Sequence, residues 1–390
     1  MERDRSSQGA LALVGAAALF TLPACLEPEP ESAYVWALLP AGVPPPPTPA
    51  DNPQTAEKVE LGRYLFYDTQ LSLEDNRACG VCHEQAKGFT DSFPRAVGTT
   101  GELHLRNTPS LTTVAYFEAL SWVDPEPVAL ETQLLSPLLG SHPIVEMGMG
   151  GREQELLDRL RPRPEYQELF PRAFPDDEDP FTIANLARAI AAFERTLLSW
   201  NSPYDRWQRG ELAALEPAAE RGRALFFGEA GCSRCHGGPN FNSPSDASGA
   251  VLEAHGSYNV GLYDVDGEGA YPEGHEGLLS VSGEPSDMGK HRTPSLRNAS
   301  YTRPYMHDGS VDTLEHAVRI MAEGGRLVDS GPNLGDGRAS PLKDEAMVDL
   351  GLDDAQLGDL VAFIGALDDE AFITSDAIAS PYPPFIPVPP

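Results

Sequence analysis

The chain has 390 residues, with 28 Lys or Arg against 59 Asp or Glu, which gives a formal net charge of −31 at pH 7. This length is sufficient for two domains of ordinary size, each with its own core. The acidic balance argues against nucleic acid or an anionic lipid surface as a partner.

The N-terminal segment has the features of a bacterial export signal. Arg3 and Arg5 precede an apolar stretch that is too short to span a bilayer. The stretch ends in Leu22-Pro23-Ala24-Cys25, which resembles a lipobox, where the Cys is lipidated after cleavage, although Pro23 is not the usual residue there. We expect residues 1–25 to be a lipoprotein-type signal peptide; the alternative is an ordinary signal peptide that is cleaved nearby.

A linker rich in Pro and Glu follows, over residues 26–52, and its composition favours an extended, semi-rigid chain. No later segment is long and apolar enough to cross a membrane. We therefore expect an exported protein that is periplasmic or is held at the outer membrane by a lipid on Cys25 alone.

Two copies of one cysteine motif account for the four cysteines outside Cys25. They are Cys79-Gly80-Val81-Cys82-His83 and Cys232-Ser233-Arg234-Cys235-His236. The C-x-x-C-H spacing attaches a c-type haem through two thioether bonds, with the His as the proximal iron ligand. A redox-active cysteine pair and a four-cysteine zinc site are the competing interpretations, but both leave His83 and His236 unexplained. The sequence therefore predicts two covalently attached haems.

The segments around the two motifs also repeat. Residues 60–66 precede the first motif and residues 220–226 the second, with Gly, Arg, Leu and Phe at matching positions. Thr108-Pro109-Ser110-Leu111 recurs as Thr293-Pro294-Ser295-Leu296. Three elements that recur in the same order indicate two related modules.

Apolar periodicity predicts helices over residues 153–160 and 183–198, and a further helix whose apolar face runs from Leu357 to Leu367. Alternating strand patterns are not evident. We predict an all-α, loop-rich fold of two cytochrome-c-like domains, each with one covalently bound haem. The expected domains are residues 53–203 and residues 204–375, followed by a Pro-rich tail over residues 376–390.

From about Leu61 to Leu367 the chain resembles the bacterial diheme cytochrome c peroxidase and MauG superfamily. The segments that carry this resemblance, beside the haem motifs, are Arg106-Asn107-Thr108-Pro109-Ser110-Leu111, Trp122, Glu146-Met147-Gly148, Arg292-Thr293-Pro294-Ser295-Leu296-Arg297-Asn298 and Tyr305-Met306-His307-Asp308-Gly309. His142-Pro143-Ile144-Val145-Glu146 and Ala191-Ala192-Phe193-Glu194-Arg195-Thr196 make it most similar to MbnH-type diheme enzymes within that superfamily.

The resemblance implies that the N-terminal haem, with His83 as its proximal ligand, is the site of reaction with peroxide. Typical members place a removable distal His seven residues before the Arg of their Arg-Asn-x-Pro segment. Thr99 occupies that position here, which implies an iron that is open without reductive activation. His104 is the alternative sixth ligand; otherwise it is a solvent-exposed loop residue.

Glu146 matches the family's distal acid, which would shuttle a proton between the two oxygens of peroxide. Gln133 matches a neighbouring distal amide that would donate a hydrogen bond to the bound peroxide. The residues alone would leave Glu146 as a surface acid in a Gly-rich stretch.

At the C-terminal haem, His236 is the expected proximal ligand, and Met321 matches the family's sixth-ligand position. A thioether ligand raises the reduction potential, which suits an electron relay; the alternative is that Met321 only fills the core. Trp122 matches a Trp that lies between the haems and would transfer electrons between them; the alternative is simple core packing.

Asn107, together with the carbonyl oxygens of Thr302 and Pro304, matches a calcium site at the domain interface. Amide and carbonyl oxygens are ligands that suit a hard cation. The resemblance therefore implies calcium as a further cofactor.

The function that the resemblance implies is that of an oxidoreductase. The leading hypothesis is an enzyme that uses hydrogen peroxide to oxidise a secreted partner protein, at Trp residues, by long-range electron transfer. The alternative is a cytochrome c peroxidase that reduces hydrogen peroxide with electrons from small redox proteins. A non-catalytic diheme electron carrier, in which Glu146 is idle, is the third hypothesis.

Overall fold

The structure is a computed structural model that describes residues 34–36, 39–40, 43–126, 128–142, 144–243 and 256–383. The expected signal peptide, Cys25, much of the expected linker and the end of the expected tail lie outside these residues. Residues from Trp36 onward belong to one structural unit, which contains both haem motifs. Among the described residues, no helix combines the length and the apolar character that crossing a bilayer requires.

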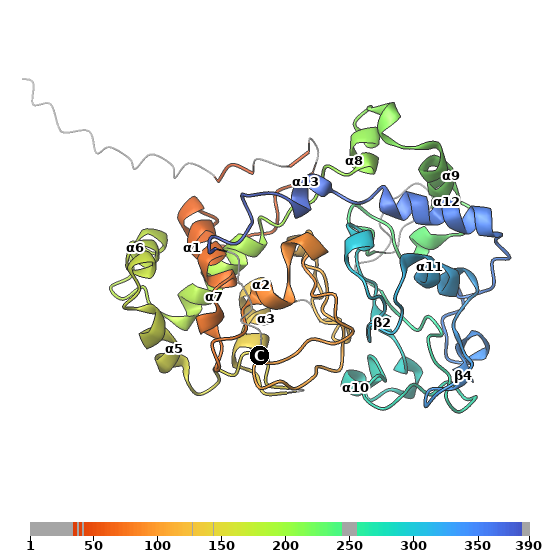
Figure 1. The fold of residues 1–390 in the computed structure, drawn as a ribbon, viewed down its shortest axis with the longest axis horizontal. Coiled ribbons are helices and arrows are strands. Elements are labelled where there is room, and N and C mark those ends of the chain that lie inside the picture. The colour runs from red at the N-terminus through yellow and green to blue at the C-terminus, as the bar shows by residue number, and fades with distance from the viewer. Residues whose placement is uncertain are drawn as a thin grey trace, which may run out of the picture. The chain divides into compact units, whose positions relative to one another are not determined.

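Helices and long loops make up most of the described chain (Figure 1). The α-helices are α1 (Ala56–Phe66), α2 (Cys79–Cys82), α3 (Leu130–Gln133), α4 (Leu135–Leu139), α5 (Glu153–Leu160), α6 (Pro164–Ala173), α7 (Ile183–Glu194), α8 (Pro203–Gln208), α9 (Pro217–Phe227), α10 (Leu279–Ser282), α11 (Leu314–Ala322), α12 (Asp354–Gly365) and α13 (Glu370–Ile373). The 3₁₀ turns are η1 (Thr69–Leu71), η2 (Gln85–Lys87), η3 (Val114–Tyr116), η4 (Leu212–Ala214), η5 (Cys232–Arg234), η6 (Pro285–Asp287), η7 (Ala299–Tyr301) and η8 (Gly337–Ala339).

Four strands of two residues each form two antiparallel pairs. They are β1 (Ser257–Tyr258) with β2 (His291–Arg292), and β3 (Leu327–Val328) with β4 (Gly335–Asp336). In the first pair Tyr258 lies opposite His291, and in the second Val328 lies opposite Gly335. The all-α, loop-rich prediction is confirmed in part: helices are the main regular structure, but two short strand pairs occur beside them.

The repeated sequence segments form the same helix crossing twice. In the first half α1 crosses α7, and a Cβ atom on Gly62 would overlap with the carbonyl oxygen of Ala189. In the second half α9 crosses α12, and a Cβ atom on Gly222 would overlap with the carbonyl oxygen of Asp359. The glycines allow each helix pair to approach closely, so the repeat in sequence corresponds to a repeat in structure.

Two large buried clusters form most of the core of the described residues, and two smaller ones lie beside them. One surrounds α1 and α7 and includes Phe66, Phe193 and Phe170, and the other surrounds α9 and α12 and includes Phe226 and Phe363. Figure 1 shows these helix pairs in opposite halves of the unit. The segment after α12 returns to the first cluster, where Phe372 and Ile378 are buried.

Local sequence determines where the main helices begin and end. The Thr182 hydroxyl accepts a hydrogen bond from the backbone N–H of Asn185 at the start of α7, and Asp353 with Gln356 forms a capping box at the start of α12. The helix predicted over residues 153–160 is confirmed as α5. The helix predicted over residues 183–198 ends early, at Glu194, where the backbone N–H and the hydroxyl of Thr196 both donate to the carbonyl oxygen of Phe193, three residues back.

Candidate functional site

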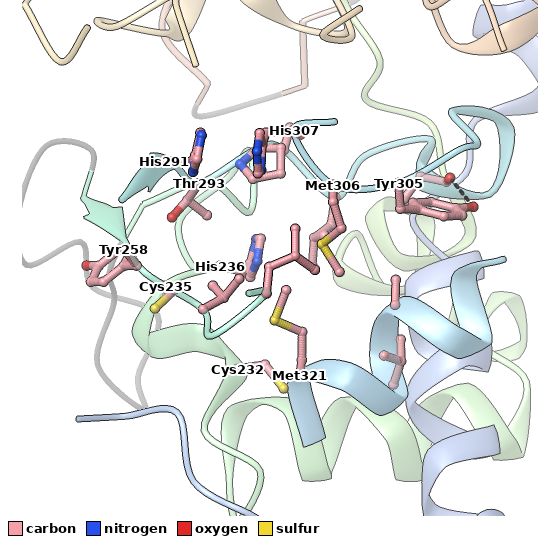
Figure 2. A pocket seen from close by; sticks show the side chains of 18 of the residues that line it. Cys232, Cys235, His236, Tyr258, His291, Thr293, Tyr305, Met306, His307 and Met321 are labelled. Atoms are coloured by element: carbon pink, nitrogen blue, oxygen red, sulfur yellow. Dashed lines mark hydrogen bonds between the residues drawn. The ribbon is translucent and has the colours of Figure 1, made fainter. Parts of the chain in front are cut away.

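Each haem motif lines a cavity, and the larger of these cavities, of about 490 Å³, lies in the second half of the unit. Cys232, Cys235 and His236 line it together with Met321, which α11 carries in its last turn. Figure 2 shows that His236 and Met321 both project into this space. The structure therefore brings the predicted proximal and sixth ligands of the C-terminal haem to one cavity.

The smaller cavity, of about 310 Å³, lies in the first half. Cys79 and Cys82 in α2 line this cavity together with His83. Gln133, at the end of α3, and Glu146 line the same cavity. Both predicted distal residues and the predicted proximal ligand are thus assembled around one space.

The two histidines have the same hydrogen-bonding pattern. The Nδ1 atom of His83 lies 2.9 Å from the carbonyl oxygen of Phe89, and Nδ1 of His236 lies 3.1 Å from that of Phe241. Burial lowers the pKa of both imidazoles, so the neutral ring donates from Nδ1. That arrangement leaves Nε2 as the metal-binding atom, as is usual for histidine ligands that are oriented by a carbonyl.

The four cysteines are partly buried. Burial raises the pKa of Cys82 and Cys232 to about 12 and that of Cys235 to about 11, and it also raises the pKa of Cys79. Redox-active and zinc-binding cysteines require the thiolate, which these surroundings disfavour. The two cysteine pairs also line different cavities, so they cannot share one four-cysteine zinc site. The arrangement fits covalent haem attachment in each cavity.

Glu146 is half-buried, and burial raises its pKa. Its carboxylate Oε1 lies 3.9 Å from Nε2 of His104, whose side chain is only 16% exposed and lines the same cavity. The Nδ1 atom of His104 accepts a hydrogen bond of 2.9 Å from the backbone N–H of Arg106. The proton of the neutral ring therefore sits on Nε2 and faces Glu146, so His104 is not the solvent-exposed loop residue expected.

Thr99 stands where typical family members have a removable histidine. It is buried, and its hydroxyl donates to Oδ1 of Asn76 over 2.8 Å and accepts from the backbone N–H of Glu74. Its own N–H donates to the carbonyl oxygen of Glu146. Thr99 is therefore a structural support for the segment that carries Glu146.

Trp122 lines both cavities and so lies in the wall that they share. Its indole Nε1 donates to the carbonyl oxygen of Asn107 over 2.8 Å. Its own carbonyl oxygen accepts from the backbone N–H of Arg292 over 2.9 Å. The indole is thus fixed between the two repeated segments, one from each half of the unit.

Arg292 is a residue that sequence reasoning missed. It is 4% exposed, it lines both cavities, and burial lowers its pKa to about 10. Within the described part of the chain its guanidinium donates to the carbonyl oxygens of Ser121 and Thr293 and forms no ion pair. A buried cation without an acid partner fits an anionic group in the cavity, such as a haem propionate. The sequence did contain one signal for Arg292. When the two repeated segments are aligned, Arg292 takes the position that Asn107 has in the first segment.

The three residues predicted to bind calcium all line the larger cavity. The Asn107 amide nitrogen donates to the carbonyl oxygen of Phe93 over 2.8 Å, which leaves Oδ1 as the atom for a cation. Thr302 and Pro304 would add carbonyl oxygens. A donor set of amide and carbonyl oxygens is of the kind that calcium prefers.

Comparisons with known proteins agree with this geometry. A family model for di-haem cytochrome c peroxidase matches residues 56–213. Cytochrome-c peroxidase IdrP1 of Denitromonas iodatirespirans is 37% identical over 343 residues, which cover 83% of this chain and 85% of that protein. Methylamine utilization protein MauG of Methylorubrum extorquens is 34% identical over 279 residues, which cover 72% of each. The crystal structure of a MauG-like protein associated with microbial copper homeostasis superposes with a TM-score of 0.85 at 43% identity, over 90% of this chain and 99% of that one.

Proposed function

The chain belongs to the di-haem cytochrome c peroxidase and MauG family of oxidoreductases, and from that premise we propose that it uses hydrogen peroxide to oxidise tryptophan side chains of a partner protein. The position of Trp122 carries this proposal. It lies in the wall between the two cavities, so an electron can pass from the second half of the unit to the peroxide site through one fixed indole.

When bound, the two c-type haems supply the reaction with peroxide and the redox steps. Glu146 accepts a proton from one peroxide oxygen and returns it to the other, and its raised pKa allows it to hold that proton between the two transfers. Nε2 of His104 faces the Glu146 carboxylate at 3.9 Å, close to where the proton is held. Gln133 offers an amide donor in the same cavity.

The second half of the unit supplies the route for electrons from the partner. We propose that His236 and Met321 hold the second haem as a relay, and that Arg292 compensates the negative charge of propionates near Trp122. Thr99, which stands where typical family members have a removable histidine, supports a peroxide site that needs no preceding reduction.

A second candidate function is the removal of hydrogen peroxide with electrons from small redox proteins. Met321 favours it, because a thioether ligand raises the reduction potential and so eases electron entry at the second haem. The likeness to cytochrome-c peroxidase IdrP1 supports the same alternative.

We propose that calcium binds to Asn107, Thr302 and Pro304 and fixes the wall between the cavities. We also propose that the protein is exported, and that a lipid on Cys25 holds it at the outer membrane. The acidic charge and the lipobox-like segment support these proposals.

The experiment is the incubation of the holoprotein with hydrogen peroxide and a candidate substrate, a secreted protein that contains tryptophan. Mass spectrometry then measures oxygen addition to tryptophan in that partner. We expect oxygen addition with the wild type, little with Trp122→Phe, and wild-type levels with the control Trp207→Phe, which lies in the second core. Equal oxidation by wild type and Trp122→Phe would show that the route through Trp122 is wrong.

A further inference from the structure

A cluster of metal-binding side chains lies beside the larger cavity, in the second half of the unit. The Nδ1 atom of His275 is 3.2 Å from Nε2 of His307. One nitrogen of each imidazole and a carboxylate oxygen of Asp308 all lie within 4.8 Å of one another. None of the three residues belongs to the predicted haem or calcium ligands.

The surroundings hold two of these side chains in place. The Asp308 carboxylate accepts hydrogen bonds from the Tyr263 hydroxyl, over 2.6 Å, and from the backbone N–H of Ser310, over 3.0 Å. The His307 ring stacks on His291 with a centroid separation of 3.6 Å and an angle of 15°. Figure 2 shows the two rings side by side at the edge of the cavity. Neighbours of this kind orient ligands at metal sites.

The donor set defines the class of ion. Two imidazole nitrogens and one carboxylate oxygen suit zinc or copper(II), whereas calcium and magnesium prefer oxygen alone. Ligands about 2.0 Å from a tetrahedral ion lie roughly 3.3 Å apart, close to the nitrogen separation observed here. We propose that His275, His307 and Asp308 bind one divalent transition-metal ion.

Nearby charges are nearly balanced. Arg106 and Arg95 oppose a positive charge at His275, whereas Asp308 and Glu276 favour it. The carboxylate of Asp308 would reduce the charge of a bound ion, and its second oxygen or water would complete the coordination. The competing interpretation is a hydrogen bond between two neutral imidazoles, which needs no ion.

The ion would join parts of the chain that are distant in sequence. His275 belongs to the loop before α10, and His307 and Asp308 belong to the turn before α11. The carbonyl oxygen of His307 accepts a hydrogen bond of 2.7 Å from the backbone N–H of Asn107 in the first half. A bound ion would therefore stabilise the wall of the larger cavity where the two halves meet.

Zinc is the probe, because it has no redox chemistry that would interfere with the haems. The holoprotein is freed of metal with EDTA and equilibrated with zinc in the presence of excess calcium, which fills any calcium site. Bound zinc is measured against haem iron by mass spectrometry. We expect one zinc for every two irons in the wild type, and at least a tenfold loss of affinity in His275→Gln and in Asp308→Asn.

The matched control is His316→Gln, because His316 is exposed on α11. It should bind zinc as the wild type does. Absence of zinc from the wild type, or equal binding by wild type and His275→Gln, would overturn the proposal. Should the variants lose haem, anomalous scattering at the zinc edge from wild-type crystals decides: a peak between the three side chains supports the site, and its absence there refutes it.

Discussion

The Nε2 atom of His104 lies 3.9 Å from Oε1 of Glu146, at the cavity that His83 also lines. Nδ1 of His104 is occupied by the backbone N–H of Arg106, so the imidazole can only donate toward the carboxylate when it is neutral. Burial and Arg106 lower the pKa of His104, which keeps the ring neutral near pH 7. Glu146 is therefore a half-buried carboxylate with a fixed donor beside it.

Replacing Glu146 with Gln removes the proton acceptor but keeps the size of the side chain. General acid–base catalysis of this kind contributes about 10²–10⁴-fold, so we expect the rate of reaction with peroxide to fall by that factor. The absorption spectra of both haems should not change. Stopped-flow mixing with peroxide measures the rate, with Glu168→Gln as a surface control on α6. A wild-type rate in Glu146→Gln would refute the role of this acid.

The pH dependence of the rate of reaction with peroxide tests whether His104 acts on Glu146. Burial raises the pKa of Glu146 above its ordinary value of 4.5, and the reactive form is the carboxylate. The rate should therefore fall as the pH is lowered through a range above 4.5. His104→Leu removes a donor that stabilises the carboxylate, so the fall should begin at higher pH. An unchanged profile would mean that His104 does not act on Glu146.

The buried Glu194 should make the free energy of unfolding depend on pH. It is buried in α7 at the smaller cavity, and burial raises its pKa to about 8. The folded state then binds a proton that the unfolded state releases near pH 4.5, so the free energy of unfolding falls as the pH rises from 4.5 to 8. Each pKa unit corresponds to about 1.4 kcal/mol.

Glu194→Gln should remove much of that slope, because a neutral amide has no proton to lose. Urea denaturation of the wild type and the variant at pH 4.5 and at pH 8 measures the change in the free energy of unfolding. Asp368, whose pKa burial raises to about 6, contributes a smaller slope that both proteins share. Parallel slopes in the two proteins would contradict the assignment to Glu194.

Gly222 and Gly358 provide a matched pair on crossing helices. A Cβ atom on Gly222 would meet the backbone of Asp359, and overpacking of this kind costs about 1–3 kcal/mol, so Gly222→Ala should lower Tm. A Cβ atom on Gly358 in α12 meets nothing, so Gly358→Ala should stabilise the protein by about 1 kcal/mol. Calorimetry of the two variants tests this, and shifts of the same sign would contradict the close helix crossing.

Met321→Leu tests the sixth ligand of the second haem. Leu has a similar volume, so the free energy of unfolding should change by less than about 1.5 kcal/mol. Loss of the thioether should lower the reduction potential of that haem and convert its ferric form from low to high spin. Spectroelectrochemistry measures both effects. If neither changes, Met321 only fills the core.

The sequence was informative where function needs a fixed spacing. Cys79, Cys82 and His83 could be assigned because the attachment chemistry requires adjacent residues, and α5 because its apolar stripe is regular. Glu146 and Trp122 were found only through family resemblance, since a lone acid or indole carries no local signal.

Other features depend on tertiary structure. Arg and Glu are usually exposed at the surface, so only the folded structure reveals that Arg292 and Glu194 are buried. His275 and His307 are distant in the sequence and meet through folded loops, so no spacing rule predicts them. The early end of α7 comes with a tight turn at Thr196, within an otherwise regular helical pattern, and the apolar periodicity carries no signal for it.

The most direct test of the central claim is the consumption of hydrogen peroxide by the diferric holoprotein, with and without a reduced small cytochrome as electron donor. We expect a prompt reaction without any reductant, followed by slow consumption that the cytochrome scarcely accelerates, because the oxidising equivalents are kept for a protein partner. Fast, cytochrome-dependent turnover, or no reaction until the second haem is reduced, would contradict it.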